Sequence, residues 1–427
     1  MYKKEKVFFK TFGCRTNVFD TQVMMNKLKD FEITQNEKDA NIVVINSCTV
    51  TNSADSTARS YINSLSKLTH KPRIIFTGCG VWTKGESLFK ENKIDALFGH
   101  SEKEKINILL KNDTKFFEAG DLKHIDDTII EKMIGKSKAF VKIQEGCDFR
   151  CSYCIIPYVR GDARSYDEQH ILNQISTLAS NGFGEFILTG TNVGSYGKEL
   201  SKLSKDSTKK KDKLAQLLKK ISMIRGVRRV RLGSVEPMQI TDEFKEILEE
   251  PWMGKQLHIA LQHTNKEMLN IMNRRNKVKS DLELFELLAS KGYALGTDFI
   301  VGHPGESKEF WEDAIKNIEK FPLTHIHSFT YSKRDGTPSC TMSKEVNGDI
   351  AKQRLKQLEN IIENKNYEFR KKQNTLEILV ESKKDNIYTG YDQYFNQIEI
   401  HSDTNLVGDW IELSNYEVKD KTNVSKF

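Results

Sequence analysis

The sequence predicts an α/β chain of three parts: a parallel α/β sheet, a partial TIM-like barrel of six strand–helix units, and a small all-β barrel. Its 427 residues leave room for about three cores at roughly 150 residues per domain. Short β-branched runs alternate with helical sequence over most of the chain, which is typical of parallel sheets. The expected divisions are a first domain at 1–112, a linker at 113–136, a second domain at 137–372 and a third at 373–427.

The first domain alternates strand-like and helical segments. Strands are expected at 6–11, 41–46, 73–77 and 96–98, with helices at 21–29 and 54–68 between them. The stretch 112–136 is polar, acidic and only weakly periodic. It is therefore interpreted as a linker.

A second alternating series follows the linker. Its helices are expected at 167–180 and 308–320, and its strands at 139–145, 185–189, 228–233, 257–261, 294–301 and 325–331. Six such units indicate a partial barrel, but an open doubly wound sheet has the same periodicity. After a charged helix at 350–372, short strands at 376–381, 388–391, 396–401 and 407–413 predict the all-β domain.

Hydropathy argues against a membrane-spanning or secreted protein, and the charge distribution bears on nucleic-acid binding. The chain has no run of about 18 apolar residues and no signal-peptide core, so we expect a cytoplasmic protein without a membrane partner and with reduced thiols. The net charge is +7, but residues 375–427 carry −5 and the rest +12. Basic runs at 198–213 (with Lys209, Lys210 and Lys211), 225–231 and 352–372 are either phosphate-facing surfaces or solvated segments.

Three of the seven cysteines form a tight motif. Cys147, Cys151 and Cys154 have the spacing C-x3-C-x2-C and directly follow the first barrel strand. Clustered thiolates in a reducing compartment indicate iron–sulfur or zinc ligation, but zinc usually needs a fourth ligand, and His124 and His170 are the nearest histidines. A four-iron cluster with three ligands keeps one iron open for a small chelating ligand, at the strand end where barrels place active sites.

The run Gln-Glu-Gly-Cys-Asp-Phe-Arg-Cys-Ser-Tyr-Cys-Ile-Ile-Pro-Tyr-Val-Arg-Gly at 144–161 resembles the methylthiotransferase branch of the radical S-adenosylmethionine superfamily. The resemblance implies a Rossmann-like N-terminal domain, a radical S-adenosylmethionine barrel and a C-terminal TRAM domain. It also implies that the three thiolates hold a 4Fe-4S cluster whose open iron binds S-adenosylmethionine. Reduction of that cofactor would yield a 5′-deoxyadenosyl radical.

Three further cysteines follow predicted strands of the first domain. Because the carboxyl ends of parallel strands share one edge of a sheet, we expect these thiols to converge. Small neighbours would let the backbone approach a cluster closely. The cysteines are Cys14, Cys48 and Cys79, and the neighbours are Gly13, Gly78 and Gly80. The resemblance implies that this triad holds a second 4Fe-4S cluster, whereas Cys340 belongs to neither set and is interpreted as incidental.

Polar residues also follow other barrel strands, in Thr189-Gly-Thr-Asn192, Ser234-Val-Glu-Pro237 and Ile300-Val-Gly-His-Pro-Gly-Glu306. Taken singly, each is a weak signal, because glycine and proline after a strand usually mark only a turn. The resemblance implies that Asn192, Ser234 and Glu236 contact S-adenosylmethionine. Four histidines have no clear assignment between structural and functional roles: His258, His263, His325 and His327.

The last domain and two departures from the family pattern bear on substrate binding. Aromatic residues of the TRAM-like domain could stack nucleic-acid bases or fill its core, although the local charge argues against strong phosphate contact: Tyr388, Tyr391, Tyr394, Phe395 and Trp410.

Gln262-His263-Thr264-Asn265 stands where the family usually has Gln-Ser-Gly-Ser, and Gly302-His303-Pro304-Gly305 replaces Gly-Phe-Pro-Gly. We expect a changed geometry near the barrel mouth.

The resemblance covers nearly the full length and implies a tRNA methylthiotransferase. One S-adenosylmethionine would give the methyl group and a second the radical. Residues 8–15, 48–52 and 331–338 are most similar to the branch acting at C2 of N6-threonylcarbamoyladenosine beside the anticodon. Alternatives are N6-isopentenyladenosine, an aspartate of a small-subunit ribosomal protein, or a non-catalytic zinc-bearing RNA-binding protein. Expected partners are tRNA, an electron donor such as flavodoxin or ferredoxin, and a sulfur donor system.

Overall fold

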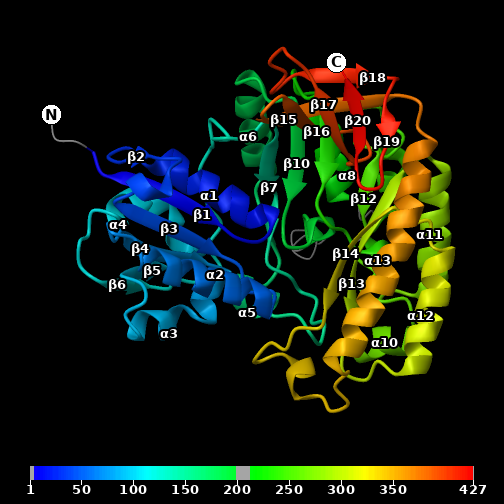
Figure 1. Cartoon of the computed structure of the whole chain (residues 1–427), viewed down its shortest axis with the longest axis horizontal. Coiled ribbons are helices and arrows are strands. Elements are labelled where there is room, and N and C mark those ends of the chain that lie inside the picture. The colour runs from blue at the N-terminus through cyan, green and yellow to red at the C-terminus, as the bar shows by residue number, and fades with distance from the viewer. Residues whose placement is uncertain (1–3, 199–211, 427) are drawn as a thin grey trace, which may run out of the picture.

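The first unit is an α/β sheet whose strands all run parallel to their neighbours, shown from blue to cyan in Figure 1. The computed structural model describes residues 4–198 and 212–426. Within the first of these ranges the strand order is β2-β1-β3-β4-β5-β6. The strands are β1 (Lys6–Thr11), β2 (Glu32–Ile33), β3 (Ile42–Ser47), β4 (Arg73–Gly78), β5 (Ala96–Phe98) and β6 (Phe116–Glu118). The four predicted strands are confirmed, and β2 and β6 are short additions at the two edges.

Helices cover both faces of this sheet: α1 (Arg15–Lys27), α2 (Asn52–Leu65), α3 (Gly85–Lys90) and α4 (Ile106–Leu109). Every residue of β3 is buried, as expected for a parallel strand covered on both faces. Helix α1 begins six residues before its predicted start. Its first turns bury the polar residues Thr16, Asn17 and Asp20 beside Phe19, so hydrophobic periodicity could not locate them.

The segment predicted as a linker packs against both of its neighbours. Strand β6 lies within it and pairs with β5. Further along, Ile130 and Met133 are buried in the core of the barrel. The backbone of Ile130 exchanges two hydrogen bonds of 2.7 Å with the side chain of Gln174. The first unit and the barrel are therefore joined through packed chain.

The second unit is a partial barrel, as predicted. Its strands within the described ranges form two parallel sheets, β7-β10-β11 and β12-β13-β14. Bridges between Val230 and Met253 and between Val235 and Ile259 join the two. The strands are β7 (Ala139–Lys142), β10 (Glu185–Thr189), β11 (Arg229–Leu232), β12 (Gln256–His258), β13 (Ala294–Val301) and β14 (His325–Thr330). One cavity receives side chains from or just beyond all of these strands, which requires the sheet to curl.

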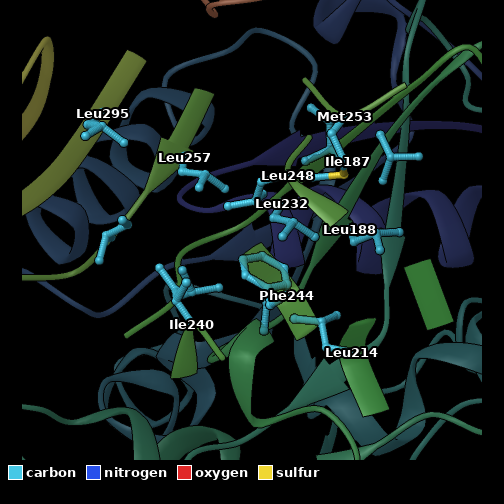
Figure 2. Close-up of a cluster of buried hydrophobic side chains, with 14 of the residues drawn as sticks. Ile187, Leu188, Leu214, Leu232, Ile240, Phe244, Leu248, Met253, Leu257 and Leu295 are labelled. Carbon is cyan, nitrogen blue, oxygen red and sulfur yellow. The ribbon is translucent and has the colours of Figure 1, made fainter. Parts of the chain in front are cut away.

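The remaining elements of this unit are β8 (Gln144–Glu145), β9 (Arg164–Ser165) and the helices α5 (Ile156–Arg160), α6 (Glu168–Ser180), α8 (Lys213–Ser222), α9 (Asp242–Ile247), α10 (Lys266–Ile271), α11 (Val278–Ser290), α12 (Lys308–Lys320) and α13 (Gly348–Lys371). Figure 2 shows part of the core between strands and helices, where Phe244 of α9 lies among Leu188, Leu232 and Leu214. Burying such a side chain contributes about 1.5–3 kcal/mol. No helix in the described parts of the chain is both long and apolar enough to cross a membrane.

The third unit is all β, as predicted, and lies over one end of the barrel in Figure 1. Its strands within 373–426 are β15 (Leu376–Lys384), β16 (Ile387–Tyr391), β17 (Gln397–His401), β18 (Trp410–Leu413), β19 (Glu417–Val418) and β20 (Asn423–Lys426). The order is β18-β15-β16-β17-β20-β19, and every pair is antiparallel except β17 with β20. Sequence analysis missed β19 and β20, because the polar run around them has little alternation.

Arginines at the start of β11 hold this sheet against the barrel. Arg231 is buried and pairs with Glu185 of β10 at 3.0 Å. Its Nη2 donates to the carbonyl oxygen of Asp392 at 2.5 Å, and its Nη1 donates to that of Gln393 at 3.1 Å. The same guanidinium lies 5.0 Å from the ring centre of Phe395. A buried charge is thus satisfied by partners from two units.

The aromatic residues of the third unit are used in packing. Tyr388 is fully buried in its core, and Trp410 lies 4.3 Å from the guanidinium of Arg228 and 4.7 Å from that of Arg229. Tyr391 stacks on Phe395, and Tyr394 packs edge-on against Phe369. Of the two interpretations of these aromatics, the structure supports core and interface packing. Three arginines of the basic run 225–231 serve the same interface.

The other basic runs divide into structural and exposed residues. On α13, Arg354 pairs with Glu306, and Lys365 donates to carbonyl oxygens at the end of α12. The exposed lysines of α13 are Lys352, Lys356 and Lys371. Lys209, Lys210 and Lys211 lie outside the described residues.

A buried ionic cluster joins the first unit to the barrel. The Nη1 of Arg160 at the end of α5 lies 2.9 Å from Asp20 of α1 and also pairs with Glu145 of β8. Lys142 of β7 lies 2.6 Å from Asp20 and 2.8 Å from Glu145. Although burial opposes ionisation, Lys142 and Arg160 hold the pKa of Asp20 below its usual value. The two domains therefore share charges that neither could bury alone.

We expect Arg160→Met to destabilise the folded chain. Removing this guanidinium leaves Asp20 and Glu145 buried without one of their partners, which should lower the free energy of unfolding by about 3–5 kcal/mol. Chemical denaturation followed by circular dichroism would measure the change. Arg59→Met at an exposed site on α2 is the control and should have little effect. Equal stability of the two variants would contradict the structural role of Arg160.

Candidate active site

A cavity of about 320 Å³ lies at the carboxyl ends of the barrel strands. It brings together all of the barrel residues for which the sequence suggested a role: Cys147, Cys151, Cys154, Asn192, Ser234 and Glu236. Val50 and Thr51 of the first unit complete its wall, just beyond Cys48. The cavity is thus shared between two domains.

Glycines shape the loop that carries the three barrel cysteines. Gly146 has φ +70°, and a Cβ there would lie 2.0 Å from the carbonyl oxygen of Asp162. Only glycine fits this approach without strain. The amide of Cys147 then donates to the carbonyl oxygen of Gly161 at 3.0 Å. Helix α5, with Pro157 in its first turn, starts directly after Cys154 and ends the loop.

The three thiols suit a cluster better than they suit a metal-free pocket. Burial raises the pKa of Cys147, and burial together with the neighbouring thiol of Cys151 raises that of Cys154 to about 12. A bound cation would be needed to hold these groups as thiolates. Nitrogen donors also face the sulfurs: Arg274 Nη1 lies 3.7 Å from Cys151 Sγ, and Asn192 Nδ2 lies 4.0 Å from Cys147 Sγ. Such donors are typical around iron–sulfur clusters.

Glu236 and Asn192 differ in how they are engaged. The carboxylate of Glu236 receives two hydrogen bonds from Arg274, of 2.9 and 2.5 Å, and Arg274 also donates to the carbonyl oxygen of Ala260. Asn192 donates toward Cys147, but its buried Oδ1 accepts no hydrogen bond within the described residues. An orphaned buried acceptor at a cavity wall indicates a missing ligand.

The first-domain cysteines follow three adjacent parallel strands, as predicted. Cys14 caps the start of α1 after β1, Cys48 follows β3, and Cys79 follows β4. A Cβ on Gly13 would lie 2.8 Å from the Sγ of Cys48, so glycine lets the Cys14 loop approach that thiol. Burial, with the thiols of Cys48 and Cys14 nearby, raises the pKa of Cys79 to about 12. This set therefore also suits a cation.

Arg160 connects the two cysteine sets physically. It belongs to the helix that follows Cys154, and its Nε donates to the Sγ of Cys79 at 3.2 Å. Its Nη2 donates to Asn17 of the first unit at 2.5 Å. The rigid fork of one guanidinium therefore positions the first-domain cysteines relative to the barrel loop.

A loop beyond β14 holds the first unit at the cavity mouth. Ser332 accepts a hydrogen bond of 2.8 Å from the amide of Asn52, and Arg334 pairs with Asp55 at 2.6 Å. Both contacts lie close in sequence to Thr51, which lines the cavity. The loop thus keeps the segment after Cys48 against the barrel.

The two departures from the family pattern are buried structural contacts. His263 lies 3.6 Å from Glu306, and its Nδ1 accepts from the amide of Asn265 at 3.0 Å. His303 hydrogen-bonds to Ser339 at 2.8 Å, which in turn contacts Ser152 between two barrel cysteines. His303 thus contacts the cysteine loop through Ser339.

Sequence analysis missed Arg160 and Arg274 as site residues. Arg160 lies in the cysteine-bearing run 144–161 and Arg274 in the pair Arg274-Arg275, but only the fold reveals that their partners are Asp20 and Glu236. Cys340 belongs to neither cysteine set, and its Sγ lies 3.8 Å from Asp335.

Two family models match this chain. Residues 6–99 match Uncharacterized protein family UPF0004, and residues 141–318 match the Radical SAM superfamily. In that superfamily a 4Fe-4S cluster works together with S-adenosylmethionine. Among solved structures, the radical S-adenosylmethionine methyltransferase TsrM from Kitasatospora setae has a TM-score of 0.58 at 14% identity, covering 79% of this chain and 74% of that one. That likeness concerns the fold alone.

Curated relatives extend over nearly all of the chain. A Helicobacter pylori (strain J99) protein named "Putative methylthiotransferase" is 52% identical over 99% of this chain and 100% of its own length. The threonylcarbamoyladenosine tRNA methylthiotransferase MtaB of Aquifex aeolicus is 30% identical over 86% of this chain and 90% of its own length. The tRNA-2-methylthio-N(6)-dimethylallyladenosine synthase of Halalkalibacterium halodurans is 30% identical over 97% and 80%. The chain therefore belongs to the radical S-adenosylmethionine methylthiotransferase family.

Proposed function

We propose that this enzyme adds a methylthio group at C2 of N6-threonylcarbamoyladenosine, next to the anticodon of tRNA. The observation that carries the proposal is the cavity shared by two domains. Its barrel wall bears Cys147, Cys151 and Cys154, and its other wall follows Cys48. A radical source and a sulfur source on opposite walls are what this transfer requires.

Each cysteine set would hold one 4Fe-4S cluster. Cys147, Cys151 and Cys154 would bind the cluster that takes S-adenosylmethionine, and the first-domain triad would bind the second. When bound, these groups supply a 5′-deoxyadenosyl radical and the sulfur that becomes the methylthio group. Radical chemistry suits the target, because the C2–H bond of adenosine has no acidic proton for a base to remove.

The polar residues of the cavity would orient S-adenosylmethionine. The Oδ1 of Asn192 is a buried acceptor without a hydrogen bond in the described residues, and Ser234 also lines the cavity. Glu236 would act through Arg274, which it holds 3.7 Å from Cys151. Arg274 would then present a fixed positive charge beside the cluster.

Apolar side chains would keep water away from the radical. Phe149, Ile155, Ile300 and Phe329 line the cavity between the polar groups. A hydrocarbon wall excludes solvent and lacks polar groups that would compete for the substrate. Tight seating of the base against this wall would favour hydrogen abstraction at C2 alone.

The choice of substrate rests on similarity to the named relatives. The segments 8–15, 48–52 and 331–338 surround the first-domain cysteines and the cavity mouth. Relatives named for threonylcarbamoyladenosine and for dimethylallyladenosine are each 30% identical. We favour the first because these segments resemble that branch more closely, and N6-isopentenyladenosine is the second candidate.

Mass analysis of tRNA nucleosides from a deletion strain tests the substrate. We expect loss of 2-methylthio-N6-threonylcarbamoyladenosine with a matching gain of N6-threonylcarbamoyladenosine. Complementation should restore the methylthiolated nucleoside. Loss of the isopentenyl derivative instead would transfer the assignment to that nucleoside. Loss of methylthioaspartate from a small-subunit ribosomal protein, with unchanged tRNA, would contradict a tRNA substrate.

Iron content tests the two-cluster assignment. Anaerobically reconstituted protein should contain about eight irons, four per cluster, and Cys147→Ala should retain about half. Cys340→Ala is the matched control, because Cys340 belongs to neither set, and it should keep the full content. If the wild-type protein holds four irons or fewer and its spectra show one cluster, the two-cluster assignment is wrong.

Separate cysteine variants test the division of labour. Cys48→Ala should still release 5′-deoxyadenosine under dithionite but form no methylthiolated tRNA, because the barrel cysteines remain complete. Cys151→Ala should do neither. Anaerobic turnover followed by chromatography of both products measures this. Normal methylthiolation by Cys48→Ala would show that the first-domain thiols are only structural.

A further inference from the structure

Three side chains on neighbouring barrel strands lie close together. His258 ends β12, Asp298 lies on β13 and His327 lies on β14. The register pairs Asp298 directly with His327, and places His258 opposite Gly296, two residues before Asp298 on the same face. Asp298 also lines the cavity. Neither cysteine set includes these groups, and the proposed reaction does not use them.

Two of the spacings between their polar atoms match that of metal ligands. The Oδ1 of Asp298 lies 3.1 Å from His258 Nε2 and 3.5 Å from His327 Nδ1. One ligand atom from each residue lies within 4.8 Å of the other two. Nitrogen and oxygen ligands at 2.0–2.2 Å from a tetrahedral zinc ion are about 3.3 Å apart. The two imidazole–carboxylate distances bracket this value.

The contacts of the two histidines with Asp298 leave one buried nitrogen without a completed hydrogen bond. Although His258 Nε2 is 3.1 Å from Asp298, it is buried and completes no hydrogen bond in the part of the chain that the structure describes. The two imidazoles stack with their ring centres 4.8 Å apart, so both border the carboxylate. A buried polar atom without a partner calls for a missing water or ion.

The backbone leaves room for the ring of His258. A Cβ on Gly296 would lie 3.1 Å from His258 Nδ1 and 3.2 Å from the Cβ of His325. A larger residue would therefore press on His258 and shift it from Asp298. The site is also reachable, because the side chain of His327 is 63% exposed whereas that of His258 is 12% exposed.

We propose that His258, Asp298 and His327 bind one divalent transition-metal ion, of which Zn²⁺ is the best match. Two imidazoles and one carboxylate are a recurrent ligand set for such ions, whereas iron–sulfur clusters require thiolates. Three protein ligands leave a coordination position for water or for an oxygen atom of a molecule in the cavity. The site is independent of the proposed function and distinct from both cysteine sets.

Zinc binding to the fully reconstituted protein tests the proposal. After both clusters are loaded, the protein is dialysed against Zn²⁺, and bound zinc is counted by elemental analysis. Zinc-edge X-ray absorption then separates nitrogen and oxygen ligands at about 2.0–2.2 Å from sulfur ligands at about 2.3 Å. We expect one zinc per chain with a nitrogen and oxygen shell.

Variants assign that zinc to the three residues. His327→Gln, at an exposed position, and Asp298→Asn should each weaken zinc binding at least about 100-fold, since even changes around metal ligands cost 10–100-fold. His401→Gln, an exposed histidine on β17, is the control and should bind as the wild type does. Unchanged affinity in His327→Gln, or zinc found only at sulfur distances, would overturn the proposal. Neither result depends on methylthiolation, so the proposed function is judged separately.

Discussion

The buried guanidinium of Arg160 is the interaction on which the arrangement of this protein depends. It pairs with Asp20 of the first unit and Glu145 of the barrel, and it donates to Cys79. Charges buried to this extent need partners, and the two domains meet in a geometry that supplies those partners from both sides. That geometry sets the first-domain cysteines beside the helix that follows Cys154. The proximity of two cysteine sets is therefore a consequence of interdomain electrostatics rather than of either domain by itself.

At the opposite end of the barrel, another buried arginine is satisfied by partners from two units, and here it anchors the C-terminal sheet. Arg231 is satisfied by Glu185, by carbonyl oxygens of the C-terminal sheet and by the ring of Phe395. The third unit is thus anchored by cations of the barrel, and its aromatic residues are engaged in this contact. Any nucleic-acid contact by this unit would have to use other side chains. One end of the barrel is closed by packing, and the other end carries the cavity.

The barrel holds a polar group among its buried apolar residues. His258, Asp298 and His327 lie on the neighbouring strands β12, β13 and β14, and Asp298 lines the cavity. Interior layers of such barrels are ordinarily filled by branched apolar residues. A polar layer costs desolvation free energy unless its groups find partners, and this cost makes an ion a reasonable occupant. Gly296 leaves space beside the ring of His258, where a larger residue would press on it.

The sequence alone determined the order of the three units, most of their strands, and both cysteine sets. Those features depend only on residues that are close together in the sequence. They are strand periodicity, the C-x3-C-x2-C spacing, and the position of cysteines just after strands. Tertiary structure decided what depends on distant partners. Nothing in the neighbouring sequence identifies Asp20 and Glu236 as the partners of Arg160 and Arg274, because these pairs form only when the chain folds. The start of α1 was missed for the same reason, since its first turns place Asp20 in a buried ionic cluster whose other members are distant in the sequence. Whether Phe395 and Trp410 pack or stay exposed was likewise settled by which surface the C-terminal sheet covers, because burial is a property of the assembled domains.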